Sequence, residues 1–252
     1  MESNQPVETG WHEIDTPDGV MGLYRAQPEG QRPDRAIVVL QEAFGVNEHI
    51  QDVTRRVAAA GFVAIAPELF HRTGTRTLDY ADHPAAMALI TELGREQIDN
   101  DIAATCDHLR DVDGIARERT GLMGFCFGGR AAFTAATALP GLAATAVFYG
   151  PGVASGPHGV LDRIGGLGGP LLYLVGDEDP TIPASDLDAI REAADMRGSD
   201  VRIETFPGAG HAFHCDARPQ MYRPQAAAAA WHMAMDLFAA TLPARADRQI
   251  GA

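Results

Sequence analysis

The chain has 252 residues, of which 46% are hydrophobic and 21% charged, and its formal net charge at pH 7 is -14. This length can bury a substantial apolar core in one α/β domain, and the composition lacks the apolar depletion that marks disorder. An acidic chain without a Lys/Arg-rich run is a poor partner for nucleic acid or an anionic membrane. We therefore expect one domain over residues 1–252 that binds neither.

The N-terminal segment and the number of cysteines indicate the cellular compartment of the protein. Met1–Gly10 is polar and acidic and lacks both the basic and the apolar part of a secretory signal. No stretch approaches the roughly 18 apolar residues that span a bilayer. The chain has three cysteines and no CxxC pair, so a disulfide framework or a structural zinc site has little support. We expect a cytoplasmic protein, a monomer or small homo-oligomer, without a metal or an organic cofactor.

The predicted elements begin with two short strands, around Trp11–Ile14 and Met21–Arg25, on either side of the turn Pro17-Asp18-Gly19. This pattern is typical of an antiparallel pair at the edge of a sheet. The next run, Ala36–Leu40, is continuously apolar and rich in β-branched residues, which indicates a strand buried on both faces. We expect this strand near the centre of the sheet.

Helices and strands alternate along the rest of the chain. The predicted helices are Ile50–Ala60, Pro84–Leu93, Arg95–Arg110, Gly128–Ala138, Pro183–Ala194 and Pro224–Ala240. The remaining predicted strands are Phe62–Ala66, Thr120–Phe125, Ala143–Tyr149, Leu171–Val175 and Val201–Phe206. The irregular segment Glu68–His83 is long enough to form a lid or a pocket wall. The alternation predicts a mostly parallel sheet with helices on both faces and a ligand site at the carboxyl ends of the strands.

The most informative motif, Gly124-Phe125-Cys126-Phe127-Gly128-Gly129, lies between a predicted strand and a predicted helix. A nucleophile on a sharp strand-to-helix turn needs small residues two positions before and after it, and Gly124 and Gly128 meet that need. At a helix N-terminus the dipole favours a Cys126 thiolate, and the N–H of Phe127 can face a developing oxyanion. The alternative is a chance Gly-x-Cys-x-Gly around a buried core cysteine.

A histidine and several acids follow in the chain order that such a nucleophile requires. His211 lies in the glycine-rich segment 206–213 after the last predicted strand, where this type of fold places its general base. The segment 176–183 offers three carboxylates that could hold the His211 ring in its useful tautomer. Asp179 is our first choice and Asp177 the runner-up, although acids in a turn are usually turn formers or helix caps.

The segment Gln41-Glu42-Ala43-Phe44-Gly45-Val46-Asn47 follows the first central strand. An α/β-hydrolase supplies its second oxyanion donor from this position, and the N–H of Ala43 is the candidate. Glu42 is either an ordinary loop carboxylate or a group that reaches the elbow cysteine and influences its proton.

Together these segments resemble the dienelactone hydrolase (carboxymethylenebutenolidase) family of α/β-hydrolases over about residues 10–240. The resemblance implies a triad of Cys126, His211 and Asp179, because the family pattern Gly-x-x-Asp-x-x-(Val/Ile)-Pro falls on Asp179. It also implies that Glu42 contacts the nucleophile and keeps it quiescent until substrate arrives. The implied reaction is cleavage of an ester or a dienelactone-like enol-lactone through a thioester acyl-enzyme.

The resemblance also implies that arginines hold a substrate carboxylate, one of them four residues beyond the histidine, where this chain has Cys215. Arg72, Arg76 and Arg218 are candidates to replace it. Cys106 and Cys215 themselves are expected to be packing residues. Two other functions stay open: acyl transfer or thioester hydrolysis by the same nucleophile, and non-catalytic ligand binding, which an intact nucleophile, base and acid disfavour.

Overall fold

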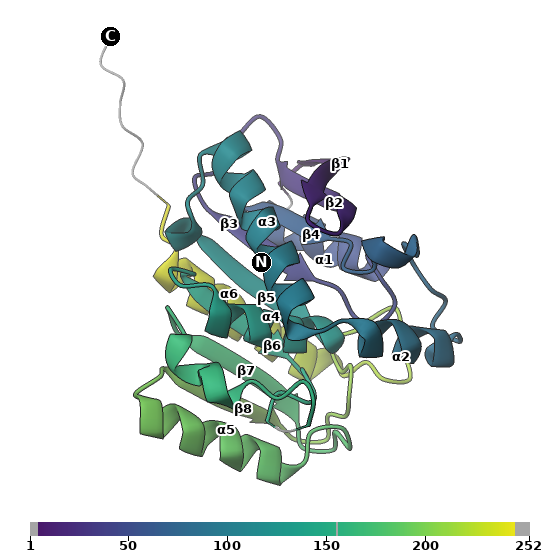
Figure 1. Ribbon diagram of the computed structural model, residues 1–252, viewed down its shortest axis with the longest axis vertical. Helices are drawn as coiled ribbons and strands as arrows, with labels where there is room; N and C mark the ends of the chain where they lie inside the picture. Colours follow the sequence, from purple (N-terminus) through teal and green to yellow (C-terminus); the bar gives the residue numbers. More distant parts are fainter. Residues whose placement is uncertain (1–4, 155, 245–252) are drawn as a thin grey trace.

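The structure is a computed structural model that describes residues 5–154 and 156–244 (Figure 1). Its strands are β1 Val7–Thr16, β2 Gly19–Pro28, β3 Ala36–Leu40, β4 Val63–Pro67, β5 Thr120–Phe125, β6 Ala144–Phe148, β7 Leu171–Gly176 and β8 Val201–Phe206. Its α-helices are α1 Glu48–Ala59, α2 His83–Glu92, α3 Arg95–Asp113, α4 Phe127–Ala138, α5 Ala184–Arg197 and α6 Pro224–Thr241. The first four of the ten residues in which we predict no secretory signal lie outside the described residues.

The strands form one sheet in the order β1-β2-β4-β3-β5-β6-β7-β8. Neighbouring strands run parallel from β4 across to β8, whereas β2 is antiparallel to both β1 and β4. All residues of β3 and β5 are buried, as expected for central strands with continuous apolar runs. The predicted mostly parallel sheet with an antiparallel pair at one edge is therefore confirmed.

Strands β1 and β2 and helix α3 are longer than the sequence pattern predicts. Strands β1 and β2 have ten residues each and pair from Val7↔Pro28 to Thr16↔Gly19. Glu8, Thr9 and Asp15 in the outer parts of β1 are polar and exposed, so backbone pairing rather than side-chain alternation sets the length of this hairpin. Helix α3 continues to Asp113 and ends at Gly114, whose positive φ of 67° is the left-handed conformation common after a helix C-terminus.

Helices cover both faces of the sheet, with α3 and α4 in front and α6 behind in the view of Figure 1. Helix α1 begins at Asn47, whose side chain accepts a hydrogen bond from the N–H of Ile50 at 3.2 Å. This cap fixes the start of α1 beside the carboxyl end of β3. Because α4 begins directly after β5, the carboxyl ends of β3 and β5 lie next to two helix N-termini.

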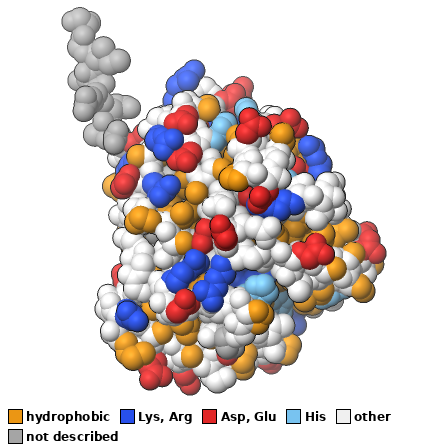
Figure 2. All heavy atoms as spheres, in the orientation of Figure 1, with side chains coloured by type: hydrophobic (Ala, Val, Ile, Leu, Met, Phe, Trp, Pro, Cys, Tyr) orange, Lys and Arg blue, Asp and Glu red, His pale blue; other side chains and the backbone are white. Residues whose placement is uncertain are grey.

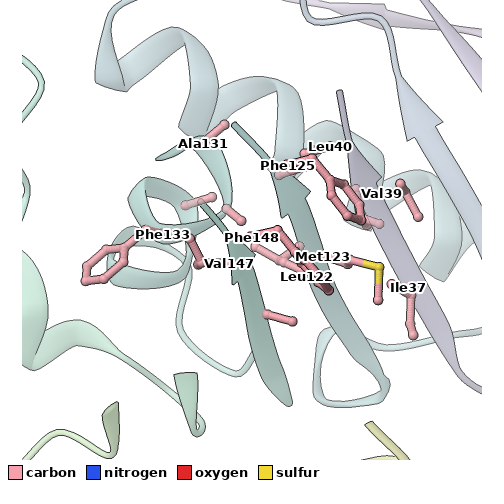
Figure 3. Close-up of a cluster of buried hydrophobic side chains, with 14 of the residues drawn as sticks. Ile37, Val39, Leu40, Leu122, Met123, Phe125, Ala131, Phe133, Val147 and Phe148 are labelled. Carbon is pink, nitrogen blue, oxygen red and sulfur yellow. The ribbon is translucent and has the colours of Figure 1, made fainter. Parts of the chain in front are cut away.

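The core lies directly below this edge of the sheet (Figure 3). Phe125 at the end of β5 and Phe148 at the end of β6 stack with ring centroids 4.6 Å apart, and both are fully buried. Aromatic pairs of this kind bury large areas and hold a fixed geometry. The residues that follow them in the chain, Cys126 and Tyr149, are thereby presented from a rigid base.

The surface is mixed in charge. Acidic and basic side chains are interspersed over the face that Figure 2 shows. None of the helices within 5–154 and 156–244 is both long and apolar enough to cross a membrane.

Candidate active site

Cys126 occupies the sharp turn between β5 and α4. Its backbone has φ 52° and ψ -118°, a combination that costs a non-glycine residue on the order of 1–3 kcal/mol and is kept only where the surroundings enforce it. The two flanking glycines enforce it through close backbone contact. A Cβ at Gly124 would lie 2.0 Å from the carbonyl oxygen of Gly128, and a Cβ at Gly128 would lie 2.2 Å from that of Leu40.

His211 meets this cysteine from a loop far along the chain. The loop joins β8 to α6, and it brings Nε2 of His211 to 3.0 Å from Sγ of Cys126. The ring of Tyr149 packs edge-on against the imidazole at a centroid distance of 5.3 Å. Cys126 is partly exposed, so the pair faces solvent rather than the core. The structure thus brings together the predicted nucleophile and base.

Asp179 lies on the other side of the imidazole. Its Oδ2 is 2.8 Å from Nδ1 of His211, and its side chain is fully buried. Asp177 is exposed, and its Oδ1 accepts a hydrogen bond from the N–H of Gly208 at 2.8 Å. The two carboxylates therefore have different partners. Asp179 contacts His211, and Asp177 caps the turn at Gly208 in the loop that carries His211.

Thr181 completes this group, and the sequence reasoning missed it. Its hydroxyl and its N–H lie 2.6 and 2.9 Å from Oδ1 of Asp179. The hydroxyl is also 3.1 Å from Nδ1 of His211. Asp-x-Thr is a sequence signal for such a local turn, since aspartate often bonds the backbone two residues on. Because Thr181 binds Oδ1 of Asp179, the other carboxylate oxygen, Oδ2, is available to the imidazole of His211.

The contacts shift the pKa of both partners in opposite directions. Burial alone would lower the pKa of His211, but its contacts with Asp179 and Cys126 outweigh burial and raise that pKa to about 10. Burial would raise the pKa of Asp179, but the bonds from His211 and Thr181 outweigh it and lower that pKa. Both shifts favour an ionised carboxylate beside a protonated imidazole.

Glu42 is buried at the carboxyl end of β3, and among the described residues no hydrogen bond joins it to Cys126. Both of its oxygens lie against Nη2 of Arg218, at 2.8 and 2.9 Å, and the Tyr149 hydroxyl is 3.5 Å from Oε1. A guanidinium is a stronger partner for a buried carboxylate than a thiol, because it neutralises the charge.

The other predicted residues fall into two groups. Ala43 and Phe127 lie where expected, Ala43 after β3 and Phe127 at the first position of α4, where its N–H has no partner within the helix. Arg72 is bound to Asp101 at 2.7 and 2.8 Å, and Arg76 is exposed beside Glu68. Of the three candidate arginines, Arg218 is therefore the one that contacts a predicted site residue.

The remaining cysteines are buried. Burial raises the pKa of the Cys106 thiol, on α3, to about 11. Cys215 is fully buried as predicted, but it also has polar neighbours: its sulfur is 3.4 Å from Nε of Arg218 and 3.5 Å from the Tyr80 hydroxyl. Cys215, Glu42 and His49 have potential metal-ligand atoms within 4.8 Å of one another. Because the Arg218 guanidinium already contacts two of these three, we assign the cluster to ion pairing.

A mostly parallel eight-stranded sheet with helices, a cysteine at the turn between β5 and α4, and a histidine after the last strand together define the class of α/β-hydrolases. A profile of the dienelactone hydrolase family matches residues 21–242. The chain belongs to this family and is a hydrolase of carboxylic esters or lactones.

Individual relatives cover most of the chain. A candidate carboxymethylenebutenolidase of Synechocystis is 38% identical over 227 residues, which are 85% of this chain and 89% of the relative. A candidate carboxymethylenebutenolidase of Methylorubrum extorquens is 35% identical over 225 residues, which are 88% of this chain and 77% of the relative. Among solved structures, a candidate dienelactone hydrolase of Klebsiella pneumoniae superposes with a TM-score of 0.86 at 32% identity, covering 93% of this chain and 99% of that one.

Proposed function

We propose that this chain cleaves an ester or a dienelactone-like enol-lactone with Cys126 as nucleophile, His211 as acid and base, and Asp179 as the residue that orients His211. The observation that carries the proposal is the continuous line of contacts from sulfur to imidazole to carboxylate, at 3.0 and 2.8 Å. A chance cysteine in the core would have no such line, because it requires three loops from distant parts of the chain to converge.

The proposed reaction has two stages. The Cys126 thiolate attacks the carbonyl carbon, and the oxyanion that forms is held by the N–H groups of Ala43 and Phe127. The leaving oxygen departs with the proton of the His211 imidazolium, which leaves a thioester on Cys126. A water molecule then gives its proton to neutral His211 and attacks the thioester, and the acid is released as the thiolate reforms.

The choice of nucleophile favours activated substrates. A thiolate is a good leaving group, so the first adduct returns to reactants when the substrate's own leaving group is poor. An enol-lactone releases a stabilised enolate and meets this requirement, whereas an amide does not. We therefore propose enol-lactones and activated esters as substrates and expect no peptidase activity.

Glu42 has a supporting role in this proposal. Its carboxylate is connected to the catalytic residues through Tyr149, whose hydroxyl faces Glu42 and whose ring packs on His211. The ion pair with Arg218 neutralises the Glu42 carboxylate and fixes its position, so Glu42 does not compete for the proton of His211. We propose that this pair, rather than direct contact with sulfur, is how Glu42 supports Cys126.

A trapping experiment tests the nucleophile. A p-nitrophenyl ester mixed with the protein and quenched in acid should add one acyl group to Cys126, visible by mass spectrometry of the digest. Cys126→Ala should abolish both the adduct and turnover, while the matched variant Cys106→Ala, in a buried cysteine on another helix, should keep both. Unchanged turnover by Cys126→Ala would remove the proposal.

Two other functions give different outcomes. Acyl transfer or thioester hydrolysis by the same nucleophile would show faster release when an alcohol, a thiol or a thioester substrate is supplied, with the same adduct on Cys126. A ligand binder without turnover would bind esters and form no adduct. We further propose, from the sequence, that the chain is a single cytoplasmic domain. We also propose that it needs no cofactor, which metal analysis would test, and that it is a monomer or small homo-oligomer, which light scattering would test.

A further inference from the structure

Strand β8 is an open edge of the sheet. It comes last in the strand order, at one side of the molecule, and among the described strands it pairs with β7 alone (Figure 1). All six residues of β7 are buried, whereas none of the six residues of β8 is. An edge strand presents unpaired N–H and C=O groups, to which another chain can add a strand. This edge is therefore a surface on which the sheet can continue.

Every second residue of β8 directs its backbone groups outward. The ladder to β7 begins with a hydrogen bond from the N–H of Leu171 to the carbonyl oxygen of Asp200. It ends with one from the N–H of Asp177 to the carbonyl oxygen of Phe206. Since the register between them is unbroken, residues 200, 202, 204 and 206 direct their backbone groups to β7. The N–H and C=O groups of residues 201, 203 and 205 face away from β7, and no described residue outside the strand bonds them.

The charged side chains of β8 are complementary to a second copy of the same strand. Arg202 and Glu204 lie on one face of the strand, and 66% and 33% of their side chains are exposed. When two copies pair antiparallel about Ile203, Arg202 of each copy lies opposite Glu204 of the other. A shift of two residues in either direction would instead place Arg202 opposite Arg202 or Glu204 opposite Glu204, and like charges in these positions repel. The charges therefore select one register.

The same register also satisfies the free backbone groups. The two copies of Ile203 exchange N–H to C=O hydrogen bonds at the two-fold axis, and Val201 of each copy bonds Thr205 of the other. The Arg202–Glu204 pairs then fall between these bonded pairs, where opposing side chains are closest. A two-fold axis makes the two halves of the contact identical, as a closed dimer requires.

Apolar surface lies beside the outward face of Arg202. A groove of about 430 Å³ is lined by Arg202 together with Met233 and Leu237 of α6. Both apolar side chains are only partly buried. A second copy on β8 would extend over this groove and remove apolar area from water, which is the main favourable contribution to most protein association.

The opposite edge of the sheet lacks this complementarity. Strand β1 carries Glu8, Glu13 and Asp15 and has neither lysine nor arginine. A second copy paired along β1 would bring the acids of both chains together without a basic partner, which is repulsive. Charges of one sign are a common protection of edge strands against unwanted pairing. Of the two edges, β8 is therefore the one that fits a second copy.

We propose that the chain forms a two-fold symmetric dimer in which β8 pairs antiparallel with β8 of a second copy, centred on Ile203. The eight strands of each copy then form one continuous sheet across the dimer. This inference goes beyond the proposed function, because it depends on neither the nucleophile nor the substrate.

Charge reversal tests the register. Sedimentation velocity over about a 100-fold range of protein concentration should show a dimer for the unchanged chain. Arg202→Glu or Glu204→Arg alone places like charges opposite each other and should raise the dissociation constant about tenfold or more. An equimolar mixture of the two variants should regain the dimer, because each then supplies the charge that the other lacks. Arg110→Glu, at an exposed position of α3, is the control and should keep the affinity of the unchanged chain.

Ile203→Pro tests the backbone pairing itself. Proline removes the N–H at the two-fold axis, and an edge strand tolerates this change because that N–H faces away from β7. The variant should be monomeric, with circular dichroism and a thermal midpoint that show whether it folds. If it does not fold, amide exchange in the unchanged chain provides the test. The outward N–H groups of residues 201, 203 and 205 should exchange about tenfold or more slowly in concentrated than in dilute solution, whereas those of residues 202 and 204 should not change.

Three results would overturn the proposal. The first is a monomer at every concentration. The second is a dimer that Ile203→Pro and both charge variants leave unchanged, because it would use another surface. The third is a mixture of Arg202→Glu and Glu204→Arg that stays monomeric, because the proposed register requires the two to pair. Cys126→Ala should keep the dimer whether or not it loses turnover, so a failure of the proposed function and a failure of this inference are distinguishable.

Discussion

Arg218 Nη2 lies within 2.9 Å of both carboxylate oxygens of Glu42, although 176 residues separate the two in the chain. The Glu42 side chain is fully buried and that of Arg218 is 13% exposed. The Arg218 guanidinium also packs 4.8 Å from the centroid of the Tyr80 ring. The pair therefore anchors the loop that carries His211 to the end of β3.

Arg218→Met should destabilise the fold strongly, because it leaves the Glu42 carboxylate buried without a partner. A loss of about 3–5 kcal/mol in the free energy of unfolding is expected for breaking such a pair. Urea denaturation followed by circular dichroism measures it. In the double variant Glu42→Gln with Arg218→Met most of the loss should be recovered, since a neutral amide replaces the stranded charge. Additive losses in the double variant would contradict a direct pair.

The two candidate acids should differ in their effect on catalysis. Asp179→Asn removes the carboxylate that fixes the His211 tautomer, and such a change lowers kcat by up to about 10⁴-fold in a related triad. Asp177→Asn alters only the cap of an exposed turn and should change kcat less than about threefold. Steady-state assays with a p-nitrophenyl ester measure both. A larger effect at Asp177 would reverse the assignment that geometry gives.

The sequence predicted the parts of the site that local chemistry determines. Cys126 and its glycines were recognisable because a strand-to-helix turn imposes their spacing, and His211 because it follows the last strand. Thr181 was missed: its bond to Asp179 is local and had a sequence signal, but its contact with His211, 30 residues further along, depends on folding. Glu42 was recognised, but its partner was not: nothing near Arg218 in the chain indicates that its guanidinium reaches β3.

The raised pKa of His211 predicts activity that persists into alkaline solution. Burial opposes the shift, and the contacts with Asp179 and Cys126 raise the pKa to about 10, so the imidazolium that protonates the leaving group should persist up to about that pH. Acylation rates from stopped-flow assays should fall as the pH rises through about 10. In Asp179→Asn the fall should move to lower pH, because a contact that favours the protonated ring is lost. A fall near the ordinary histidine pKa in the unchanged chain would contradict the pairing.

His214 should make the fold sensitive to acid. Its ring is stacked on Trp231 at 5.7 Å and lies 5.2 Å from the rings of Phe125 and Phe148, and its buried Nδ1 has no partner among the described residues. Burial, with His49 and Arg56, lowers its pKa to about 3 from an ordinary value of 6.5. The neutral ring therefore contributes stability above pH 6.5 that is lost as the pH falls toward 3, because the unfolded chain takes up the proton first.

His214→Phe keeps an aromatic ring in this place and removes the titrating group. Denaturation midpoints in urea, measured from neutral pH down to about pH 4, should fall less steeply in this variant, by up to about 1.4 kcal/mol per pH unit in the free energy of unfolding. His232→Gln, on an exposed position of α6, controls for the loss of a histidine and should follow the unchanged chain. Parallel curves for His214→Phe and the unchanged chain would mean that His214 takes up its proton without unfolding, which a ring enclosed by three aromatic side chains does not allow.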